Sequence, residues 1–118
     1  MDIAGSIASR ITPAQAQEMV SKGNALIVDV RDASEVKKSG KIAGSIHVSP
    51  GMLAFRADPD MPYYDQNFNK ERAVIIYCTS SNGSALSGRL LKNMGYSHVF
   101  NLGTFENWVE SGGAIEPQ

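Results

Sequence analysis

Residues 73–84 have the sequence AVIIYCTSSNGS, and this stretch decides the fold that we predict for the chain. Its first part is an apolar run over residues 73–77 that is rich in β-branched side chains. The short length indicates a strand, and the lack of alternation indicates that both faces of the strand are covered. The small polar residues after Cys78 predict a tight loop, followed by a helix that starts near Ser84 and ends at Gly95. Apolar residues at helical spacing mark that helix: Leu86, Leu90, Leu91 and Met94.

Similar patterns lie on both sides of this stretch. Residues 25–30 form a second apolar run, and residues 98–102 form a weaker third one. Residues 11–23 and 104–111 have the pattern of helices. Because doubly covered strands alternate with helices, we predict an α/β fold with a parallel sheet and helices on both of its faces.

The helix predicted over residues 11–23 has clear signals at both ends. Thr12 and Gln15 have the spacing of a capping box, with Pro13 at the first helical position. Gly23 is placed to end the helix in a left-handed conformation.

Residues 50–72 have a different character. Three prolines lie among polar residues, and Tyr63, Tyr64 and Phe68 are interleaved with them. We predict a long ordered connection, because a connection of this length in a small domain is usually functional or packed against the surface.

Length and composition limit what the chain can be. Its 118 residues suit one compact domain, and 42% hydrophobic with 19% charged residues is an ordinary globular balance. A formal net charge of -1, with both signs scattered, gives no reason to expect a nucleic acid or a membrane surface as partner. We see no signal peptide in the first residues, and a single cysteine suits a reducing compartment, so we expect a cytoplasmic protein. One cysteine and two histidines make a poor structural metal set, and we expect no metal.

Cys78 is the candidate reactive residue. It follows a buried strand directly, and in parallel α/β sheets ligands bind beyond the carboxyl ends of the strands. A strand, a tight loop and a helix N-terminus would together direct backbone N–H groups at the sulfur and stabilise its thiolate, which is the reactive form. The alternative is an inert packing cysteine, because free cysteines are among the residues most often buried. From the loop alone, both interpretations stay open.

Four segments in order, from about Ile11 to Pro117, resemble the rhodanese family. The first two are DVRDASE at residues 29–35 and GKIAGS at 40–45, where Lys41 replaces the family's usual His and Ser45 the usual Ala. The third is the cysteine loop, YCTSSNGSA, at residues 77–85. The fourth combines Met94-Gly95-Tyr96 and Asn101-Leu102-Gly103 with Trp108 and Gly112-Gly113.

This resemblance implies a five-stranded parallel sheet flanked by helices on both faces, formed by one domain over residues 11–118 after an N-terminal extension at 1–10. It also implies a sulfurtransferase that carries sulfane sulfur as a persulfide on Cys78, with thiosulfate or another persulfide as donor and a thiol as acceptor. A protein could also be the donor or the acceptor. No cofactor is implied, since sulfur is itself the group that is carried. The substrate-binding loop would consist of Thr79, Ser80, Ser81, Asn82, Gly83 and Ser84.

One departure from the family concerns charge. Members that use thiosulfate usually carry a basic residue, most often Arg, at the fifth position after the cysteine, which is Gly83 here. Without a charge-assisted bond, which typically contributes ~1.5–3 kcal/mol, we expect weak activity with thiosulfate or a different donor. We also expect Gly83→Arg to raise thiosulfate turnover. Arg56, in the long connection, is a candidate replacement cation, although a solvated surface Arg is the simpler interpretation.

Three further residues are expected to support the loop. Arg31 and Glu35 are interpreted as an ion pair beside it, and Asp29 as an acceptor for backbone donors or a partner for a cation. The alternative to an enzyme is a catalytically weak or inactive rhodanese-like module that binds a partner or a small anion. A phosphatase, which some relatives of this fold are, is disfavoured because neither Gly83 nor Ser84 can clamp a phosphate.

Overall fold

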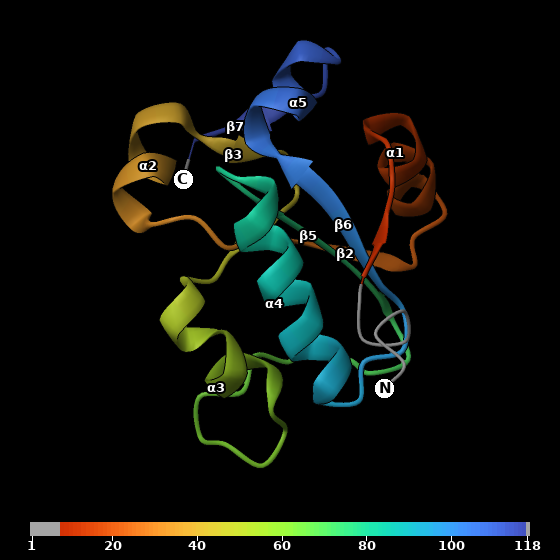
Figure 1. Cartoon of the computed structure of the whole chain (residues 1–118), viewed down its shortest axis with the longest axis vertical. Coiled ribbons are helices and arrows are strands. Elements are labelled where there is room, and N and C mark those ends of the chain that lie inside the picture. Colours follow the sequence, from red (N-terminus) through yellow and green to blue (C-terminus); the bar gives the residue numbers. More distant parts are fainter. Residues whose placement is uncertain (1–7, 118) are drawn as a thin grey trace.

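A five-stranded parallel sheet forms the centre of the molecule (Figure 1). The computed structural model describes residues 8–117, with the backbone but not the side chain of Ser81. The strand order is β1-β6-β5-β2-β4, and each neighbouring pair is parallel. These strands are β1 (Ser9–Arg10), β2 (Ala25–Asp29), β4 (Ile46–His47), β5 (Ala73–Cys78) and β6 (Val99–Thr104). The predicted α/β class and the five-stranded parallel sheet are confirmed.

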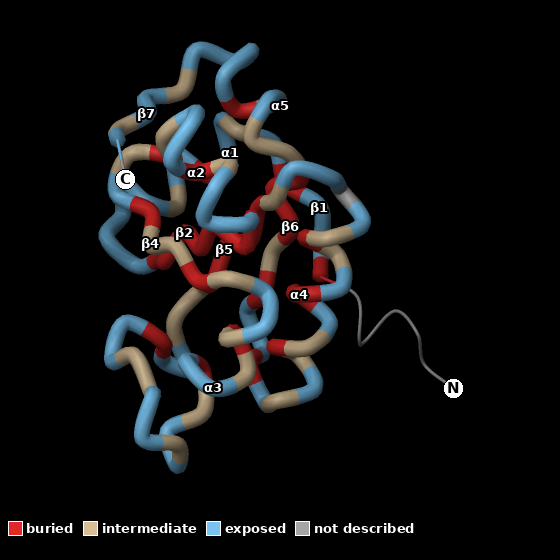
Figure 2. The backbone as a smooth tube through the Cα atoms, turned by 90° about the vertical axis from the view of Figure 1, so that its left-hand side faces the viewer, coloured by how far each residue is buried: buried red, intermediate tan, exposed pale blue. Residues whose placement is uncertain are grey.

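Helices cover both faces of this sheet. The helices are α1 (Pro13–Ser21), α2 (Ala33–Ser39), α3 (Leu53–Ala57), α4 (Ser81–Asn93) and α5 (Phe105–Glu110), with a 3-10 turn, η2, at Pro50–Met52. Leu53 of α3 and Leu91 of α4 belong to one buried cluster, whereas Ala16 of α1 and Trp108 of α5 belong to a second. In Figure 2 the buried backbone is concentrated along the central strands between these layers.

Strand β5 serves both clusters because successive side chains of a strand point to opposite faces. Val74 and Ile76 lie in the cluster of α3 and α4, and Cys78 packs against the same cluster. Ile75 and Tyr77 lie in the cluster of α1 and α5. The prediction that both faces of this strand are covered is therefore confirmed. Burial on both faces explains why apolar and polar residues do not alternate along β5.

The register of β5 changes where it approaches its carboxyl end. Ile76 is opposite Asn101, but Tyr77 is opposite Gly103, so that Leu102 is an extra residue on β6. Gly103 has φ +96°, and a side chain there would meet the Arg10 guanidinium. A bulge of this kind redirects a strand next to its end, and here it sets the ends of β5 and β6 opposite each other at Cys78 and Thr104.

The signals predicted for the first helix are present. The Thr12 hydroxyl accepts the Gln15 N–H at 3.1 Å, and the Gln15 side chain accepts the Thr12 N–H at 2.8 Å. Gly23 has φ +77°. The capping box and the left-handed stop are thus confirmed, although α1 is shorter than predicted because these caps lie outside the helix proper.

A second, two-stranded antiparallel sheet joins β3 (Lys41–Ile42) to β7 (Ile115–Glu116). The Lys41 ammonium lies 2.6 Å from a Glu116 carboxylate oxygen and also donates to the Ser45 carbonyl. The Lys that replaces the family's usual His therefore ties residues near the end of the chain to the turn before β4.

The connection over residues 50–72 is ordered, as predicted, but it also contains α3, which the sequence analysis did not predict. Phe68 is fully buried, and the Tyr64 hydroxyl donates to its carbonyl. The Tyr96 hydroxyl donates to the Ala57 carbonyl at 2.6 Å. The burial of Phe68 in the core and the Tyr96 hydrogen bond attach the connection to the body of the domain, while the Tyr64 contact lies within the connection.

Two expected boundaries differ from the structure. Helix α4 begins at Ser81 rather than near Ser84, because Ser80 caps it. Leu86, one of the apolar residues whose spacing predicted this helix, is 68% exposed. Ser9 and Arg10, which the predicted division assigned to an extension, pair with β6, and residues 1–7 lie outside the described part.

Over residues 8–117, no helix has the length and apolar character that crossing a membrane requires.

Candidate functional site

Cys78 is the last residue of β5 rather than the first residue after it, because it still pairs with Thr104. Its side chain is partly exposed, and it is a free cysteine. The Sγ atom lies 3.7 Å from the Val30 carbonyl oxygen, to which the thiol donates. The sulfur is therefore at the carboxyl edge of the sheet, on the face that α3 and α4 cover.

The loop after Cys78 is short. Only Thr79 and Ser80 separate β5 from α4, so that Asn82, Gly83 and Ser84 belong to the first turn of the helix. The Ser80 hydroxyl accepts the Gly83 N–H at 3.1 Å. The loop predicted over residues 79–84 is therefore two residues followed by a capped helix, because Ser80 satisfies an N–H group that the first turn leaves unpaired.

The first turn of α4 is fixed to the sheet. Ser84 is fully buried, and its hydroxyl donates to Asn101 Oδ1 at 2.6 Å. The same oxygen accepts the Gly103 N–H at 2.8 Å. Asn101 is thus the acceptor that joins α4 to the bulge in β6, and the sequence analysis did not assign it a role.

Gly83 lies against the thiol. A Cβ atom built on Gly83 would be 2.8 Å from Cys78 Sγ and 3.5 Å from Cys78 Cβ. A side chain at this position would therefore press on the sulfur, and the expectation that Gly83→Arg raises thiosulfate turnover finds no support in this geometry.

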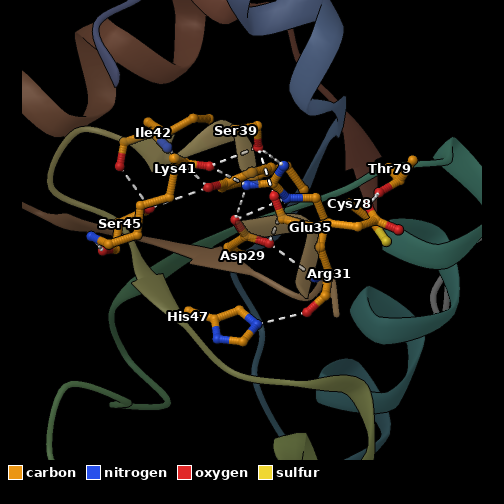
Figure 3. A network of polar contacts seen from close by, with 12 residues as sticks. Asp29, Arg31, Glu35, Ser39, Lys41, Ile42, Ser45, His47, Cys78 and Thr79 are labelled. Carbon is orange, nitrogen blue, oxygen red and sulfur yellow. Dashed lines mark hydrogen bonds and ion pairs between the residues drawn. The ribbon is translucent and has the colours of Figure 1, made fainter. Parts of the chain in front are cut away.

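Asp29 and Arg31 form a buried ion pair beside the loop (Figure 3). Arg31 Nη2 lies 2.7 Å from Asp29 Oδ2, and Arg31 Nε donates to both carboxylate oxygens at 3.1 Å. The guanidinium also donates to the Ser39 hydroxyl and to the Gly40 carbonyl. Burial by itself would lower the pKa of Arg31, but the hydrogen bonds and the charge of Asp29 outweigh it and raise that pKa.

The prediction that Arg31 forms an ion pair with Glu35 is wrong. The Arg31 guanidinium pairs with Asp29, and the Glu35 carboxylate instead accepts the Thr79 hydroxyl. Glu35 is on α2, one turn before the Ser39 that Arg31 contacts, so α2 reaches the ion pair and the cysteine loop from one face. The expectation that Asp29 pairs with a cation is confirmed.

Aromatic rings cover the ion pair. The guanidinium carbon of Arg31 lies 4.1 Å from the ring centroid of Phe105 and 5.6 Å from that of Tyr77. The Ser45 hydroxyl donates to the Ile42 carbonyl, so the Tyr77 hydroxyl is the donor in its contact with Ser45. Burial, with further contributions from Asp29, raises the pKa of Tyr77 above its ordinary value of 10.0.

A cavity of about 290 Å³ opens between α2 and α5 next to the loop. Phe105 and Arg31 contribute to its wall, and so does Thr79, the residue that follows Cys78. Its other lining residues are Glu35, Lys38, Ser39 and Glu106. Nothing in the helical pattern of residues 104–111 signals that Phe105 lines this cavity.

The remaining candidates lie apart from this arrangement or have structural contacts. Arg56 is exposed on α3, and its side chain makes no hydrogen bond or ion pair with any described residue, so its role as a replacement cation stays a prediction. His47 Nε2 lies 2.6 Å from the Arg31 carbonyl oxygen (Figure 3). Among residues 8–117, no cluster of three or more His, Cys, Asp or Glu side chains could hold a metal ion.

The chain is similar to known sulfurtransferases over most of its length. The family of the rhodanese-like domain matches residues 12–111. The thiosulfate sulfurtransferase GlpE of Ectopseudomonas mendocina is 36% identical over 103 residues, which cover 84% of this chain and 83% of that protein. The GlpE of Coxiella burnetii is 30% identical over 100 residues, covering 84% and 85%.

One solved structure with a high overlap has a different description. A protein of unknown function from Rhodopseudomonas palustris, described as a possible tyrosine phosphatase, has a TM-score of 0.83 and 35% identity. The match covers 92% of this chain and 85% of that chain. The fold shared with this protein agrees with the parallel sheet and flanking helices in Figure 1.

Proposed function

This chain belongs to the rhodanese family, and on that premise we propose that it is a sulfurtransferase that carries sulfane sulfur as a persulfide on Cys78. The observation that carries the proposal is the place of this partly exposed thiol, at the carboxyl end of β5 and against the first turn of α4. Ligands of parallel α/β sheets bind at this edge.

The reaction has two steps that exchange one sulfur atom. The Cys78 thiolate attacks the outer sulfur of thiosulfate, the S–S bond of thiosulfate breaks, and sulfite leaves with the bonding electron pair. The Cys78 persulfide then holds the transferred sulfur. An acceptor thiolate, or cyanide, attacks that outer sulfur, and the Cys78 thiolate is released with the electron pair.

The residues after Cys78 would bind the anions of this cycle. Ser80 caps α4, so the N-terminal end of the helix, with its partial positive charge, lies beside the sulfur. Asn82 is exposed at this end, whereas Ser84 is engaged with Asn101. Backbone N–H groups and the helix dipole would thus stabilise the thiolate and the persulfide.

The ion pair of Asp29 and Arg31 would support the structure beside the loop without contacting the substrate. The two charged groups are engaged with each other, and the Arg31 guanidinium also donates to Ser39 and Gly40, so neither group is available to a substrate. Glu35 would hold the loop through the Thr79 hydroxyl. We assign these residues a supporting role and not a catalytic one.

Thiosulfate is expected to be a weak donor. The residues from Thr79 to Ser84 include no cationic side chain, so the sulfite part of thiosulfate lacks a charge-assisted bond there. A persulfide donor, either a small molecule or a protein, would depend less on that bond. Arg56 stays a candidate for the missing charge.

A phosphatase is the second candidate, because the R. palustris protein is described as a possible tyrosine phosphatase. Catalysis on a phosphate monoester needs groups that stabilise the transferring phosphoryl oxygens, usually Arg, Lys or a metal ion. Gly83 and Ser84 provide no such group, and Arg89 is exposed further along α4. We therefore favour sulfur transfer.

Sulfur transfer to cyanide tests the proposal. Wild type and Cys78→Ser are supplied with thiosulfate, with a small organic persulfide, or with an aryl phosphate. We expect turnover with both sulfur donors in wild type, faster with the persulfide, and none in Cys78→Ser. Release of phosphate without sulfur transfer would favour the phosphatase, and neither activity would favour a binding module.

A further inference from the structure

We propose that the cavity between α2 and α5 binds the acceptor of the second transfer step, and that this acceptor is a small thiol with both an ammonium and a carboxylate group. Lys38 would bind the carboxylate of the acceptor, and Glu106 would bind its ammonium. This inference rests on the proposed function in one respect, since it takes Cys78 as the group that carries sulfur.

The cavity lies next to the thiol. Cys78 Sγ contacts the Val30 carbonyl oxygen at 3.7 Å. The residues that follow these two in the chain, Thr79 and Arg31, both line the cavity. Because one residue spans at most about 3.6 Å of chain, the wall of the cavity begins beside the sulfur.

The size and the apolar part of the cavity suit a small organic molecule. Its volume is about 290 Å³, near the lower end of the range for small-molecule sites. Phe105 lines the cavity and is only half-buried, so that part of its ring is open to the carbon chain of a ligand.

Two of the charged residues in the wall are already engaged. The Arg31 guanidinium is paired with Asp29, and the Glu35 carboxylate accepts the Thr79 hydroxyl (Figure 3). Arg31 therefore offers a ligand no unpaired positive charge, whereas Glu35 adds negative charge to the wall.

The other two charged residues of the wall are free to bind a ligand. Lys38 on α2 and Glu106 on α5 are exposed, and neither side chain makes a hydrogen bond or an ion pair with any residue of the described range 8–117. They have opposite charges and come from the two helices between which the cavity opens. A zwitterionic thiol matches both charges, whereas a purely anionic ligand would also meet the carboxylate of Glu35.

Thiol–disulfide exchange at Cys78 tests this inference without a sulfur donor. The Cys78 thiolate attacks one sulfur of a symmetrical disulfide, the S–S bond of the reagent breaks, and one thiolate leaves with the electron pair. The reagents are cystamine, which carries ammonium groups, dithiodipropionate, which carries carboxylates, and the uncharged bis(hydroxyethyl) disulfide. Intact-protein mass spectrometry gives each rate, and the uncharged reagent corrects for any change in the reactivity of the thiol itself.

Relative to the uncharged reagent, we expect Lys38→Met to slow the reaction with dithiodipropionate about threefold, the effect of one solvent-exposed ion pair. Glu106→Gln should slow the reaction with cystamine by a similar factor. Cystine, which carries both groups, should be slowed by both variants. All of these differences should disappear in about 1 M salt, which screens exposed charges.

Lys37→Met and Glu110→Gln are the matched controls. Both residues are exposed, lie on the same two helices and do not line the cavity, and their substitution changes the net charge equally. Each control should leave every rate within about 1.5-fold of wild type, because its charge is farther from the ligand and is screened.

Equal effects from the controls, or no effect of reagent charge in Lys38→Met and Glu106→Gln, would overturn the inference. An effect in only one of these two variants would overturn the assignment of a zwitterionic acceptor. A native Cys78 that reacts with none of the disulfides would overturn it as well, because no acceptor in the cavity could then reach the sulfur.

The failures of the two proposals are distinguishable. A chain that never carries sulfur could still select disulfides by charge in this way. A chain that carries sulfur on Cys78 but shows no such selection would contradict the inference about the cavity alone.

Discussion

Asp29 and Arg31 face each other across 2.7 Å with almost no exposure to solvent, at 0% and 3% of their side-chain surface. Removal of one charge from such a pair leaves the other buried and unpaired, which typically costs roughly 3–5 kcal/mol. We therefore expect Asp29→Asn to lower the free energy of unfolding by about that amount in urea denaturation.

The control for this prediction is the exposed pair of Glu18 and Lys22, whose side chains are 67% and 71% exposed. Glu18→Gln should change the free energy of unfolding by at most about 1 kcal/mol. An Asp29→Asn variant as stable as Glu18→Gln would show that the buried pair is not needed.

Tyr77→Phe tests the hydrogen bonds on the other face of β5. The Tyr77 hydroxyl accepts the Ile42 N–H at 3.0 Å, and both residues are buried. Loss of the hydroxyl leaves this N–H and the Ser45 oxygen without that partner, which should cost roughly 1–3 kcal/mol in the free energy of unfolding. A Ser45→Ala variant should cost less, because the Ile42 N–H keeps its bond to the Tyr77 hydroxyl, and the Ile42 carbonyl, which loses the Ser45 hydroxyl, still accepts the Ser45 N–H. Equal losses would contradict this order.

The lowered pKa of Glu116 predicts that the stability of the protein depends on pH. Its hydrogen bond with Lys41, then that with the Gly44 N–H and the charge of Lys41, hold the pKa of Glu116 below its ordinary value of 4.5. A depressed pKa contributes stability that is complete above the unfolded value and disappears as the pH falls through the folded value. Wild type should therefore exceed Glu116→Gln in Tm above pH 4.5, and the difference should shrink on acidification.

The same comparison in a Lys41→Met background is the control. Without the ammonium, the change in Tm that Glu116→Gln causes should depend less on pH. A pH dependence that is unchanged in this background would mean that Lys41 does not set the pKa of Glu116.

A cation placed beside the sulfur should improve thiosulfate use only where it leaves the sulfur undisturbed. Asn82 is exposed, whereas a Cβ on Gly83 would press on Sγ. We expect Asn82→Arg to lower the KM for thiosulfate by about tenfold, the effect of one charge-assisted bond, and Asn82→Gln, which adds no charge, to leave that KM unchanged. An equal fall in KM from Asn82→Gln would contradict the role of the added charge.

The sequence predicted those parts of the fold that depend on local patterns. The apolar runs at 25–30 and 73–77 became β2 and β5, and the capping box at Thr12 is present. Such signals need only neighbouring residues, because burial on both faces and the capping of free N–H groups both appear as short patterns.

Contacts between distant residues could not be predicted in this way. Asp29 and Glu35 both lie close to Arg31 along the chain, but the Glu35 carboxylate accepts the hydroxyl of the distant Thr79, and Arg31 pairs with Asp29. The close approach of Gly83 to Cys78 Sγ depends on Ser80 starting the helix early, and the contact of Lys41 with Glu116 depends on β7 returning to β3.

Intact-protein mass spectrometry tests the central claim most directly. Wild type and Cys78→Ala are incubated with thiosulfate and, separately, with a low-molecular-weight persulfide, and each sample is then treated with cyanide. Our account predicts that wild type gains the mass of one sulfur atom, that cyanide removes it, and that Cys78→Ala gains nothing while remaining folded. A cyanide-removable sulfur on Cys78→Ala, or none on wild type from either donor, would contradict sulfur carriage on Cys78.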